Sequence, residues 1–237
     1  MIKIIAIIPA LNEEKSIVEV IKKINSIHCE EDIKIIPLVI NDSSTDRTAE
    51  LCKKENCILI NLPVNLGIGG AVQTGFKYAF NEGYDYAVQV DGDGQHPCEK
   101  IPDMLKVAME GYDVVIGSRF INNKGFRSTF LRRAGIWYFK YIIKILCKIT
   151  ITDCTSGFRM LNRKAMKIVA EFYPDDYPEP VSIILFKQNN LKIKEIPVIM
   201  SERIEGRSSI RALNTLYYII KVSLAILFSY LRTKKQK

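Results

Sequence analysis

The feature that most constrains the fold is a regular alternation, through the first half of the chain, of short apolar runs with amphipathic segments. Continuous runs rich in Val and Ile are typical of parallel strands that are buried on both faces. The runs lie at 3–8, 34–40, 57–61, 86–90 and 113–117, and the expected helices at 14–27, 45–56, 70–81 and 98–109. The sequence therefore predicts an α/β fold with a mostly parallel sheet and helices on both faces.

Composition and charge set the class of protein and the expected partners. Of the 237 residues, 48% are apolar and 25% charged, which is ordinary globular usage and excludes disordered, collagen-like and polytopic membrane chains. The formal net charge of +8 favours partners with negative charge, such as nucleotide phosphates, nucleic acid or an anionic membrane surface. Such an excess of positive charge also serves solubility, so the charge alone does not choose among these partners.

The cysteines and the N-terminus indicate a reducing compartment. The six cysteines form no C-x-x-C pair and no zinc-type spacing with His28 or His96. Only five uncharged apolar residues separate Lys3 from Pro9, which is short for the hydrophobic region of a signal peptide. We therefore expect a cytosolic protein with reduced thiols.

Polar residues follow four of the expected strands at the point where each strand ends. Asn12 and Glu14 follow the first strand, Asp42 the second, Asn65 the third and Asp91 the fourth. The carboxyl ends of parallel strands meet at one edge of the sheet, and ligands of open α/β sheets bind there. Each residue taken singly is explained as well by a helix cap or a turn. Their gathering at one edge predicts a binding cleft.

Asp91 and Asp93 are the sharpest local signal for chemistry. Residues i and i+2 leaving a strand face the same way, so two carboxylates converge on one hard cation, Mg²⁺ or Mn²⁺, and Gln95 adds an oxygen ligand. Such a cation would neutralise charge on a nucleotide diphosphate. The alternative is turn chemistry, because Asp-Gly is a strong turn signal. An EF-hand loop is excluded, since Gln95 and His96 occupy positions that need other residues.

Arginines offer forks for phosphate groups at two places. Arg119 follows the fifth strand, and Arg203 and Arg207 lie near Ser208 after the last apolar run of the domain. A guanidinium group binds phosphate through two parallel hydrogen bonds, although exposed arginines are commonly only solvated. Asp42 is placed to accept a hydrogen bond from a base N–H or a ribose hydroxyl.

The segment 130–149 predicts an amphipathic helix. Its lysines at 140, 144 and 148 share one face, and Trp137 lies among apolar residues on the others. This pattern is typical of a helix lying in a membrane interface. The alternative is a surface helix whose apolar side packs on the protein core.

The segment 212–231 predicts a second helix of this kind. It carries one charge, Lys221, and the uncharged stretches on either side are short for a spanning helix. We favour a helix docked on the membrane and anchored by the basic tail, with a single transmembrane helix as the alternative. Its apolar residues also repeat with a 4-3 spacing that suits a packing stripe. The stripe consists of Leu213, Tyr217, Ile220, Leu224, Leu227 and Leu231.

Several segments together resemble family 2 glycosyltransferases of the GT-A fold. The segments similar to the family as a whole are IPALNEE (8–14), INDSSTDRT (40–48), NLGIGGA (65–71) and VDGDGQHP (90–97). Those similar to its polyprenyl-phosphate hexose synthase branch, which includes dolichyl-phosphate mannose synthases, are GSRF (117–120), TDCTSGFR (152–159) and residues 203–208. The resemblance covers roughly residues 2–210. It implies a GT-A catalytic domain over 1–210, with 211–237 as a membrane-associated helix and basic tail.

The resemblance also implies roles for individual residues. The nucleotide-sugar would be held by Pro9, Asn12, Glu14, Asp42, Asn65 and Asp91. A divalent metal would be held by Asp91, Asp93 and Gln95. Phosphates of the donor or the acceptor would be contacted by Arg119, Arg203, Arg207 and Ser208. The residues closest to catalysis would be Asp93, Arg119 and Glu179. The family's usual paired acids after the second strand are Asn41 and Asp42 here, which leaves the nucleotide base open.

The acceptor decides the role of Glu179, which falls where the family places a catalytic carboxylate. A lipid phosphate is already ionised near neutral pH and needs no base, so Glu179 would orient the sugar or a cationic group. A saccharide hydroxyl needs a base to take its proton. Glu179 is also explained as an acid in the first turn of a helix at 179–189. Asp153 is a second candidate for organising the acceptor side.

The leading hypothesis is an inverting, metal-dependent transfer of a hexose or N-acetylhexosamine from a UDP- or GDP-sugar to a polyprenyl phosphate at the cytosolic face of the membrane. The second keeps the fold but transfers to a saccharide hydroxyl in wall or surface polysaccharide synthesis. A third, a non-catalytic nucleic-acid or membrane-binding protein, lacks the motifs it requires. The expected partners are the nucleotide-sugar, a polyprenyl phosphate or glycan acceptor, an anionic membrane surface and a small membrane protein or second copy of the chain, but no nucleic acid.

Overall fold

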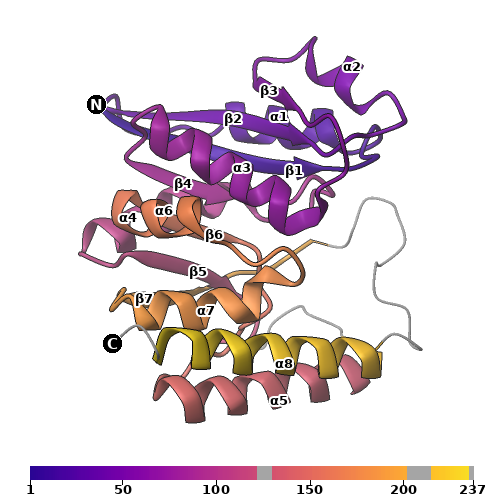
Figure 1. Ribbon diagram of the computed structural model, residues 1–237. Coiled ribbons are helices and arrows are strands. Elements are labelled where there is room, and N and C mark those ends of the chain that lie inside the picture. Colours follow the sequence, from indigo (N-terminus) through magenta and orange to yellow (C-terminus); the bar gives the residue numbers. More distant parts are fainter. Residues whose placement is uncertain (122–129, 202–214, 235–237) are drawn as a thin grey trace.

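A seven-stranded sheet forms the centre of the molecule (Figure 1). The computed structural model describes residues 1–121, 130–201 and 215–234. The strands lie in the order β3-β2-β1-β4-β6-β5-β7. Their bounds are β1 Ile2–Ala10, β2 Ile33–Asn41, β3 Ile58–Asn61, β4 Tyr86–Gln89, β5 Val114–Ser118, β6 Arg159–Asn162 and β7 Ile193–Pro197. The helices are α1 Ile17–Asn25, α2 Thr48–Cys52, α3 Gly67–Asn81, α4 Ile101–Met109, α5 Phe130–Cys147, α6 Arg163–Glu171, α7 Pro178–Gln188 and α8 Thr215–Lys234.

Strand β6 is the one strand of the described sheet that runs against its neighbours. It pairs antiparallel with β4 and β5, whereas the other pairings are parallel. Its first residue, Arg159, lies opposite Ile116 near the end of β5. The segment that leads into β6 therefore reaches the same edge of the sheet at which β1, β2, β4 and β5 end.

Helices cover both faces because side chains alternate along each strand. On β1, Ile4, Ala6 and Ile8 point to one face and join a buried cluster with residues of α1 and α4. The intervening Ile5 and Ile7 point to the other face and pack with residues of α3 and α6. These residues are fully buried, so the apolar runs are strands covered on both faces. The predicted α/β fold with a mostly parallel sheet is confirmed.

The sequence did not predict three elements, β6, α6 and β7. The two strands have only four and five residues, and β6 begins with a charged residue. A short strand that pairs with distant strands owes its conformation to those partners, so local periodicity does not reveal it. The helix expected at 45–56 is also shorter than predicted, since α2 covers five residues.

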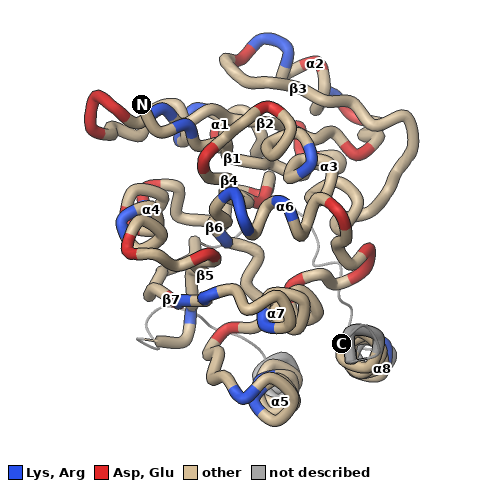
Figure 2. Tube along the Cα trace, turned by 60° about the vertical axis from the view of Figure 1, so that its left-hand side comes forward, with Lys and Arg blue, Asp and Glu red and all other residues tan. Residues whose placement is uncertain are grey.

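A third apolar cluster holds α5, α7 and α8 together at one end of the sheet (Figure 1). Phe139 and Ile143 of α5, Ile184 of α7 and Val222 and Ile226 of α8 are buried in it. Neither α5 nor α8 contains Asp or Glu, and Figure 2 shows both without acidic positions. The outer surface of this end of the molecule is therefore apolar and basic.

The two sides of α5 divide between core and solvent. Phe139 and Ile143 pack into the cluster and Ile136 is buried, as the alternative of a core-packed surface helix requires. Trp137 is 67% exposed and stacks on Tyr141, with ring centroids 5.9 Å apart. The helix therefore packs on the protein and still presents an aromatic surface.

The expected packing stripe on α8 is wrong for packing within the chain. Ile220, Leu224, Leu227 and Leu231 are exposed, and Val222 and Ile226 are buried instead. The helix is apolar almost all round, so the 4-3 spacing identified an apolar row but not the row that faces the protein. Leu213 lies outside the described residues. Among the helices the structure describes, none combines the length and hydropathy needed to cross a bilayer.

Candidate active site

The loops after β1 and β2 are bound to each other at the strand-end edge. The backbone N–H of Asn12 donates to Ser44 Oγ at 2.9 Å, and Asn12 Oδ1 accepts from the N–H of Thr45 at 2.8 Å. Arg47 Nε donates to Glu14 Oε2 at 3.2 Å. Asn12 has a φ of 57°, a left-handed conformation that asparagine tolerates better than most residues. The two loops thus form one wall, which contains the predicted nucleotide residues Asn12 and Glu14.

Asp42 joins this wall to the start of α3. Its side chain is 3% exposed, and its two oxygens accept the backbone N–H groups of Leu66 at 2.7 Å and Gly67 at 3.0 Å. Asn65 Oδ1 accepts the same Gly67 N–H at 2.9 Å. Both oxygens of the Asp42 carboxylate therefore order the turn at 65–67, a role that the sequence did not indicate.

Asp91 follows β4 and is held on three sides. Its backbone N–H donates to His96 Nδ1 at 2.9 Å, so the His96 proton lies on Nε2, which is 3.4 Å from Asp91 Oδ2. Gln89 Nε2 donates to Asp91 Oδ1 at 3.2 Å. His96 is 5% exposed and packs on the ring of Phe158. The sequence analysis did not assign His96 to the site, although its position within the DGDGQHP motif was a usable signal.

Asp93 completes a pair of carboxylates at this turn. It is 5% exposed, and its Oδ1 accepts the N–H of Gln95 at 3.0 Å. Within the described part of the chain, no three His, Cys, Asp or Glu side chains form a group that could hold a metal. Two carboxylates and an amide instead suit Mg²⁺ or Mn²⁺ that completes its coordination with phosphate oxygens and water. The donor set therefore fits a metal that binds together with a diphosphate.

Glycines bring neighbouring segments against this turn. A Cβ on Gly92 would lie 3.1 Å from the carbonyl oxygen of Pro9, so the turn at 91–95 lies against the end of β1. A Cβ on Gly157 would lie 2.8 Å from Gln89 Nε2 and 3.5 Å from Asp91 Oδ1. A side chain at residue 157 would therefore displace the Gln89 amide that donates to Asp91.

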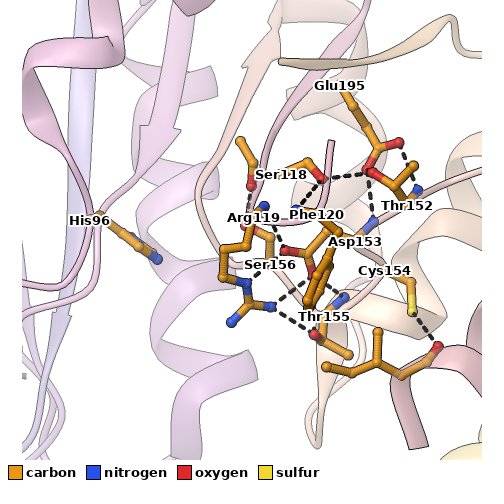
Figure 3. Close-up of polar contacts among 12 residues, drawn as sticks. His96, Ser118, Arg119, Phe120, Thr152, Asp153, Cys154, Thr155, Ser156 and Glu195 are labelled. Carbon is orange, nitrogen blue, oxygen red and sulfur yellow. Dashed lines mark hydrogen bonds and ion pairs between the residues drawn. The ribbon is translucent and has the colours of Figure 1, made fainter. Parts of the chain in front are cut away.

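Arg119 lies directly after β5 and forms a buried ion pair with Asp153 (Figure 3). Arg119 is 7% exposed and Asp153 is fully buried. Arg119 Nε and Nη2 donate to the two Asp153 oxygens at 2.6 and 2.7 Å, and Nη2 also donates to Thr155 Oγ1 at 2.8 Å. The backbone N–H of Arg119 donates to Asp153 Oδ2 at 3.1 Å. These bonds fix the plane of the guanidinium group.

Arg159 is a second buried arginine, and the sequence analysis assigned it no role. It is 1% exposed and donates to the carbonyl oxygens of Ser156 and Cys154 and to Ser182 Oγ, at 2.7, 3.1 and 2.7 Å. No carboxylate of the described residues forms an ion pair with it. Arg159 therefore ties the segment after Asp153 to the first turns of α7 through neutral acceptors and leaves a positive charge in the interior.

Glu179 lies in the first turn of α7, after Tyr177 in a left-handed conformation. Its side chain keeps some accessible surface but lies among many protein atoms, and burial raises the pKa of this carboxyl. The positive charge of Arg159 lowers the same pKa, and the negative charge of Asp91 raises it. The helix expected at 179–189 begins one residue earlier and ends one residue earlier than predicted.

Gln95 links the turn at 91–95 to the segment after β7. Gln95 exchanges hydrogen bonds with Ser201, the last residue described before the Arg203 segment, at 3.0 and 3.3 Å. Arg203, Arg207 and Ser208 lie outside the described residues. Burial raises the pKa of the Cys154 thiol to about 12, so this thiol is protonated at neutral pH and is not a nucleophile.

Comparison with known proteins agrees with this architecture. Residues 5–169 match the family described as glycosyl transferase family 2. A UDP-N-acetylglucosamine–dolichyl-phosphate N-acetylglucosaminyltransferase of Methanococcus voltae is 32% identical over 81% of this chain and 83% of its own length. An undecaprenyl-phosphate mannosyltransferase of Micrococcus luteus is 27% identical over 87% of this chain and 86% of its own length.

A solved structure shares the fold. It is the crystal structure of glucosyl-3-phosphoglycerate synthase from Mycobacterium tuberculosis with Mn²⁺, uridine diphosphate and phosphoglyceric acid. The TM-score is 0.71, with 18% identity over 96% of this chain and 78% of that one. At this identity the likeness shows the fold alone, and the bound Mn²⁺ and nucleotide belong to that protein.

Proposed function

Since the chain belongs to glycosyl transferase family 2 and is a glycosyltransferase, we propose that it moves a hexose or N-acetylhexosamine from a UDP- or GDP-sugar to a polyprenyl phosphate. The alternative of a non-catalytic nucleic-acid or membrane-binding protein is wrong, because the family match and the named relatives identify an enzyme. The relatives support a polyprenyl- or dolichyl-phosphate acceptor, and they differ from each other in the sugar.

One observation carries the proposal: a single segment, 153–158, contacts both halves of the site. Asp153 at its start pairs with Arg119, and Gly157 near its end lies against Asp91. The same short segment therefore contacts Asp91, which would bind the metal of a metal–diphosphate complex, and Arg119, which would bind a phosphate group. This arrangement fits a reaction in which one phosphate group departs and another attacks.

The donor would lie on the side of β1, β2 and β4. The nucleoside would be held by Asn12, Glu14, Asp42 and Asn65, with Pro9 beside the turn at 91–95. Asp91, Asp93 and Gln95 would hold Mg²⁺ or Mn²⁺, which supplies positive charge against the diphosphate that leaves. The Asp91 carboxylate is bound by amide and imidazole groups rather than by Lys or Arg, so its negative charge is retained for a cation.

The acceptor would lie on the side of β5 and α7. Its phosphate oxygen is ionised near neutral pH and attacks the anomeric carbon from the face opposite the diphosphate, so the configuration inverts. Arg119 would orient that phosphate, and the fixed plane of its guanidinium group suits the task. Arg203, Arg207 and Ser208 would add contacts to the phosphates. Glu179 would orient the sugar rather than remove a proton.

The apolar outer surface of α5 and α8 would bind the membrane that contains the acceptor. Trp137, Tyr141 and Ile145 on α5 and Ile220 and Phe228 on α8 are each more than half exposed. The helices contact each other through Tyr138 and Ser223. Aromatic and aliphatic side chains with lysines beside them suit an interface of anionic lipid. We expect the cytosolic face, and we assign residues 1–210 to catalysis and 211–237 to the membrane-associated helix and tail.

A donor screen tests the proposal. The enzyme, in detergent with Mg²⁺ or Mn²⁺ and a polyprenyl phosphate, is offered radiolabelled UDP- and GDP-sugars. Label that enters the organic phase and is absent with Asp93→Ala supports the proposal and identifies the donor. Donor hydrolysis without lipid product contradicts it.

A second candidate function is transfer to a saccharide hydroxyl, and the raised pKa of Glu179 favours it. A carboxyl with a raised pKa is a better general base than an ordinary one. If the hydroxyl is the acceptor, Glu179→Gln abolishes transfer with every acceptor. If the lipid phosphate is the acceptor, the variant keeps measurable transfer.

A further inference from the structure

Glu195 on β7 binds the segment that holds Arg119, and neither the sequence motifs nor the proposed mechanism accounts for it. Its Oε2 accepts the N–H of Thr152 at 2.7 Å (Figure 3). Its Oε1 accepts the Thr152 hydroxyl at 2.8 Å and the N–H of Asp153 at 2.8 Å. Three donors from two consecutive residues thus converge on one carboxylate. A Gln side chain cannot replace it, because its amide nitrogen would meet the Thr152 N–H donor to donor.

The contacts continue from Thr152 to β5. The Thr152 hydroxyl lies 2.7 Å from Ser118 Oγ, and since its proton goes to Glu195, its oxygen accepts the Ser118 proton. Ser118 Oγ in turn accepts the N–H of Phe120 at 3.3 Å. The residues on either side of Arg119 are therefore bound into the same set of hydrogen bonds.

Strand pairing explains why Glu195 can reach this segment. Strand β7 runs parallel to β5, with Glu195 opposite Ile116 and Pro197 opposite Ser118. The hydrogen bond from the Asp153 N–H to Glu195 holds the backbone of Asp153 in place. The Asp153 carboxylate in turn orients Arg119 by accepting two short hydrogen bonds from its guanidinium group. Both guanidinium nitrogens that bind Asp153 depend on where the 152–153 backbone lies.

We propose that Glu195 is a positioning residue that orients the Arg119 guanidinium group toward the acceptor phosphate by fixing Thr152 and Asp153. The inference rests on the proposed function, since it assigns Arg119 to the acceptor. Glu195 itself touches no substrate. A purely structural Glu195 would stabilise the fold without favouring one substrate over the other.

The first test compares Glu195→Gln with Lys194→Gln, a control on the same strand whose side chain is exposed and lies over Tyr112. We expect Glu195→Gln to raise the KM for polyprenyl phosphate about tenfold, the usual weight of a hydrogen bond to a charged group. The KM for the nucleotide-sugar should stay within about twofold of the wild-type value, because Glu195 forms no hydrogen bond to the residues proposed to hold the donor. The control should change neither constant.

A second pair of variants keeps the test decisive if Glu195→Gln is poorly folded. Thr152→Val removes the hydroxyl that joins Glu195 to Ser118, and Thr152→Ser restores it. We expect Thr152→Val to raise the KM for the lipid phosphate and Thr152→Ser to recover it. Equal effects of the two variants would overturn the proposal.

A double-mutant cycle separates this inference from the proposed function. If Glu195 acts through Arg119, Glu195→Gln has no further effect on lipid-phosphate transfer in an Arg119→Lys background. Equal fold losses in both backgrounds, or equal losses for both substrates, overturn the inference. If Arg119→Lys alone leaves transfer unchanged, the role proposed for Arg119 is wrong, and the inference fails with it.

Discussion

The donor side and the acceptor side of the site are built in different ways. On the proposed donor side, the polar residues follow the ends of β1, β2, β3 and β4, and Asp42 and Asp91 are held by backbone and neutral side-chain groups. On the acceptor side, Asp153 precedes a short antiparallel strand and is paired with the guanidinium of Arg119. In the proposed mechanism, the negative charge of Asp91 and Asp93 on one side would bind a metal cation. On the other side, the negative charge of Asp153 fixes the Arg119 cation of the protein itself.

The largest effect is expected on kcat, from removing the Asp93 charge on the donor side. Asp93→Asn keeps an oxygen for the N–H of Gln95 but removes the charge that would face a metal. We expect kcat to fall about 10²- to 10³-fold, which is typical when one group that stabilises developing charge is lost. The binding of Mn²⁺ with nucleotide, followed by electron paramagnetic resonance, should weaken in parallel. Unchanged Mn²⁺ binding would remove Asp93 from the metal site.

The next prediction concerns the acceptor side, where removing the Asp153 charge should lower the free energy of unfolding. Asp153→Asn leaves the Arg119 charge buried without its partner, so we expect the free energy of unfolding to fall by about 3–5 kcal/mol. Urea denaturation measures it. Arg119→Met combined with Asp153→Leu removes both charges and should recover most of the stability while transfer stays low. A loss below about 1 kcal/mol for Asp153→Asn would mean that the pair is solvated.

A smaller effect is expected where the two sides meet. Gly157→Ala forces a Cβ to within 2.8 Å of Gln89 Nε2 and 3.5 Å of Asp91 Oδ1. We expect kcat to fall about tenfold, because an ångström of displacement at a reacting group costs up to about 10². Gly135→Ala is the matched control, since the nearest atom to the added Cβ would be Ile219 Cδ1 at 3.9 Å. Alanine within α5 should stabilise the protein by up to about 1 kcal/mol.

The smallest effect concerns Glu179 in the first turn of α7. Burial raises its pKa in the folded protein, so ionisation is easier in the unfolded chain and folding loses stability as pH rises through the two pKa values. Glu179→Gln should therefore raise the melting temperature by a few degrees at pH 7.5 and leave it nearly unchanged at pH 4. A larger gain at pH 4 than at pH 7.5 would contradict the raised pKa.

The same comparison explains how much could be predicted from the sequence. Two of the strands on the donor side, β1 and β2, are long runs rich in Ile, so they were predicted to within about two residues at each end. The edge at which Asp42 and Asp91 lie followed from the fold class. The acceptor side depends on β6 and β7, which are short and exist through pairing with β5. Glu195 lies in β7 outside any recognised motif. Arg159 closes the TDCTSGFR segment, but its burial and its partners come from the pairing of β6 and from α7.

The helices at the far end of the sheet show a related limit. The sequence predicted α5 and α8 as apolar helices, but which apolar row packs on the protein depends on the shape of α7 beneath them. Val222 and Ile226 are buried, and the row at Ile220 and Leu224 remains exposed. Apolar periodicity identified the helices, and only packing against α7 selects the buried row.

The proposed reaction requires one side of the site to hold a nucleotide diphosphate and the other to hold the acceptor phosphate that attacks the sugar. The most direct measurement offers the enzyme a labelled nucleotide-sugar with either a polyprenyl phosphate or the same polyprenol without its phosphate, and compares lipid-linked product. We expect lipid-linked product only with the polyprenyl phosphate and, for Arg119→Lys, a higher KM for the lipid phosphate with little change in the KM for the nucleotide-sugar. Equal transfer to the free polyprenol would contradict it.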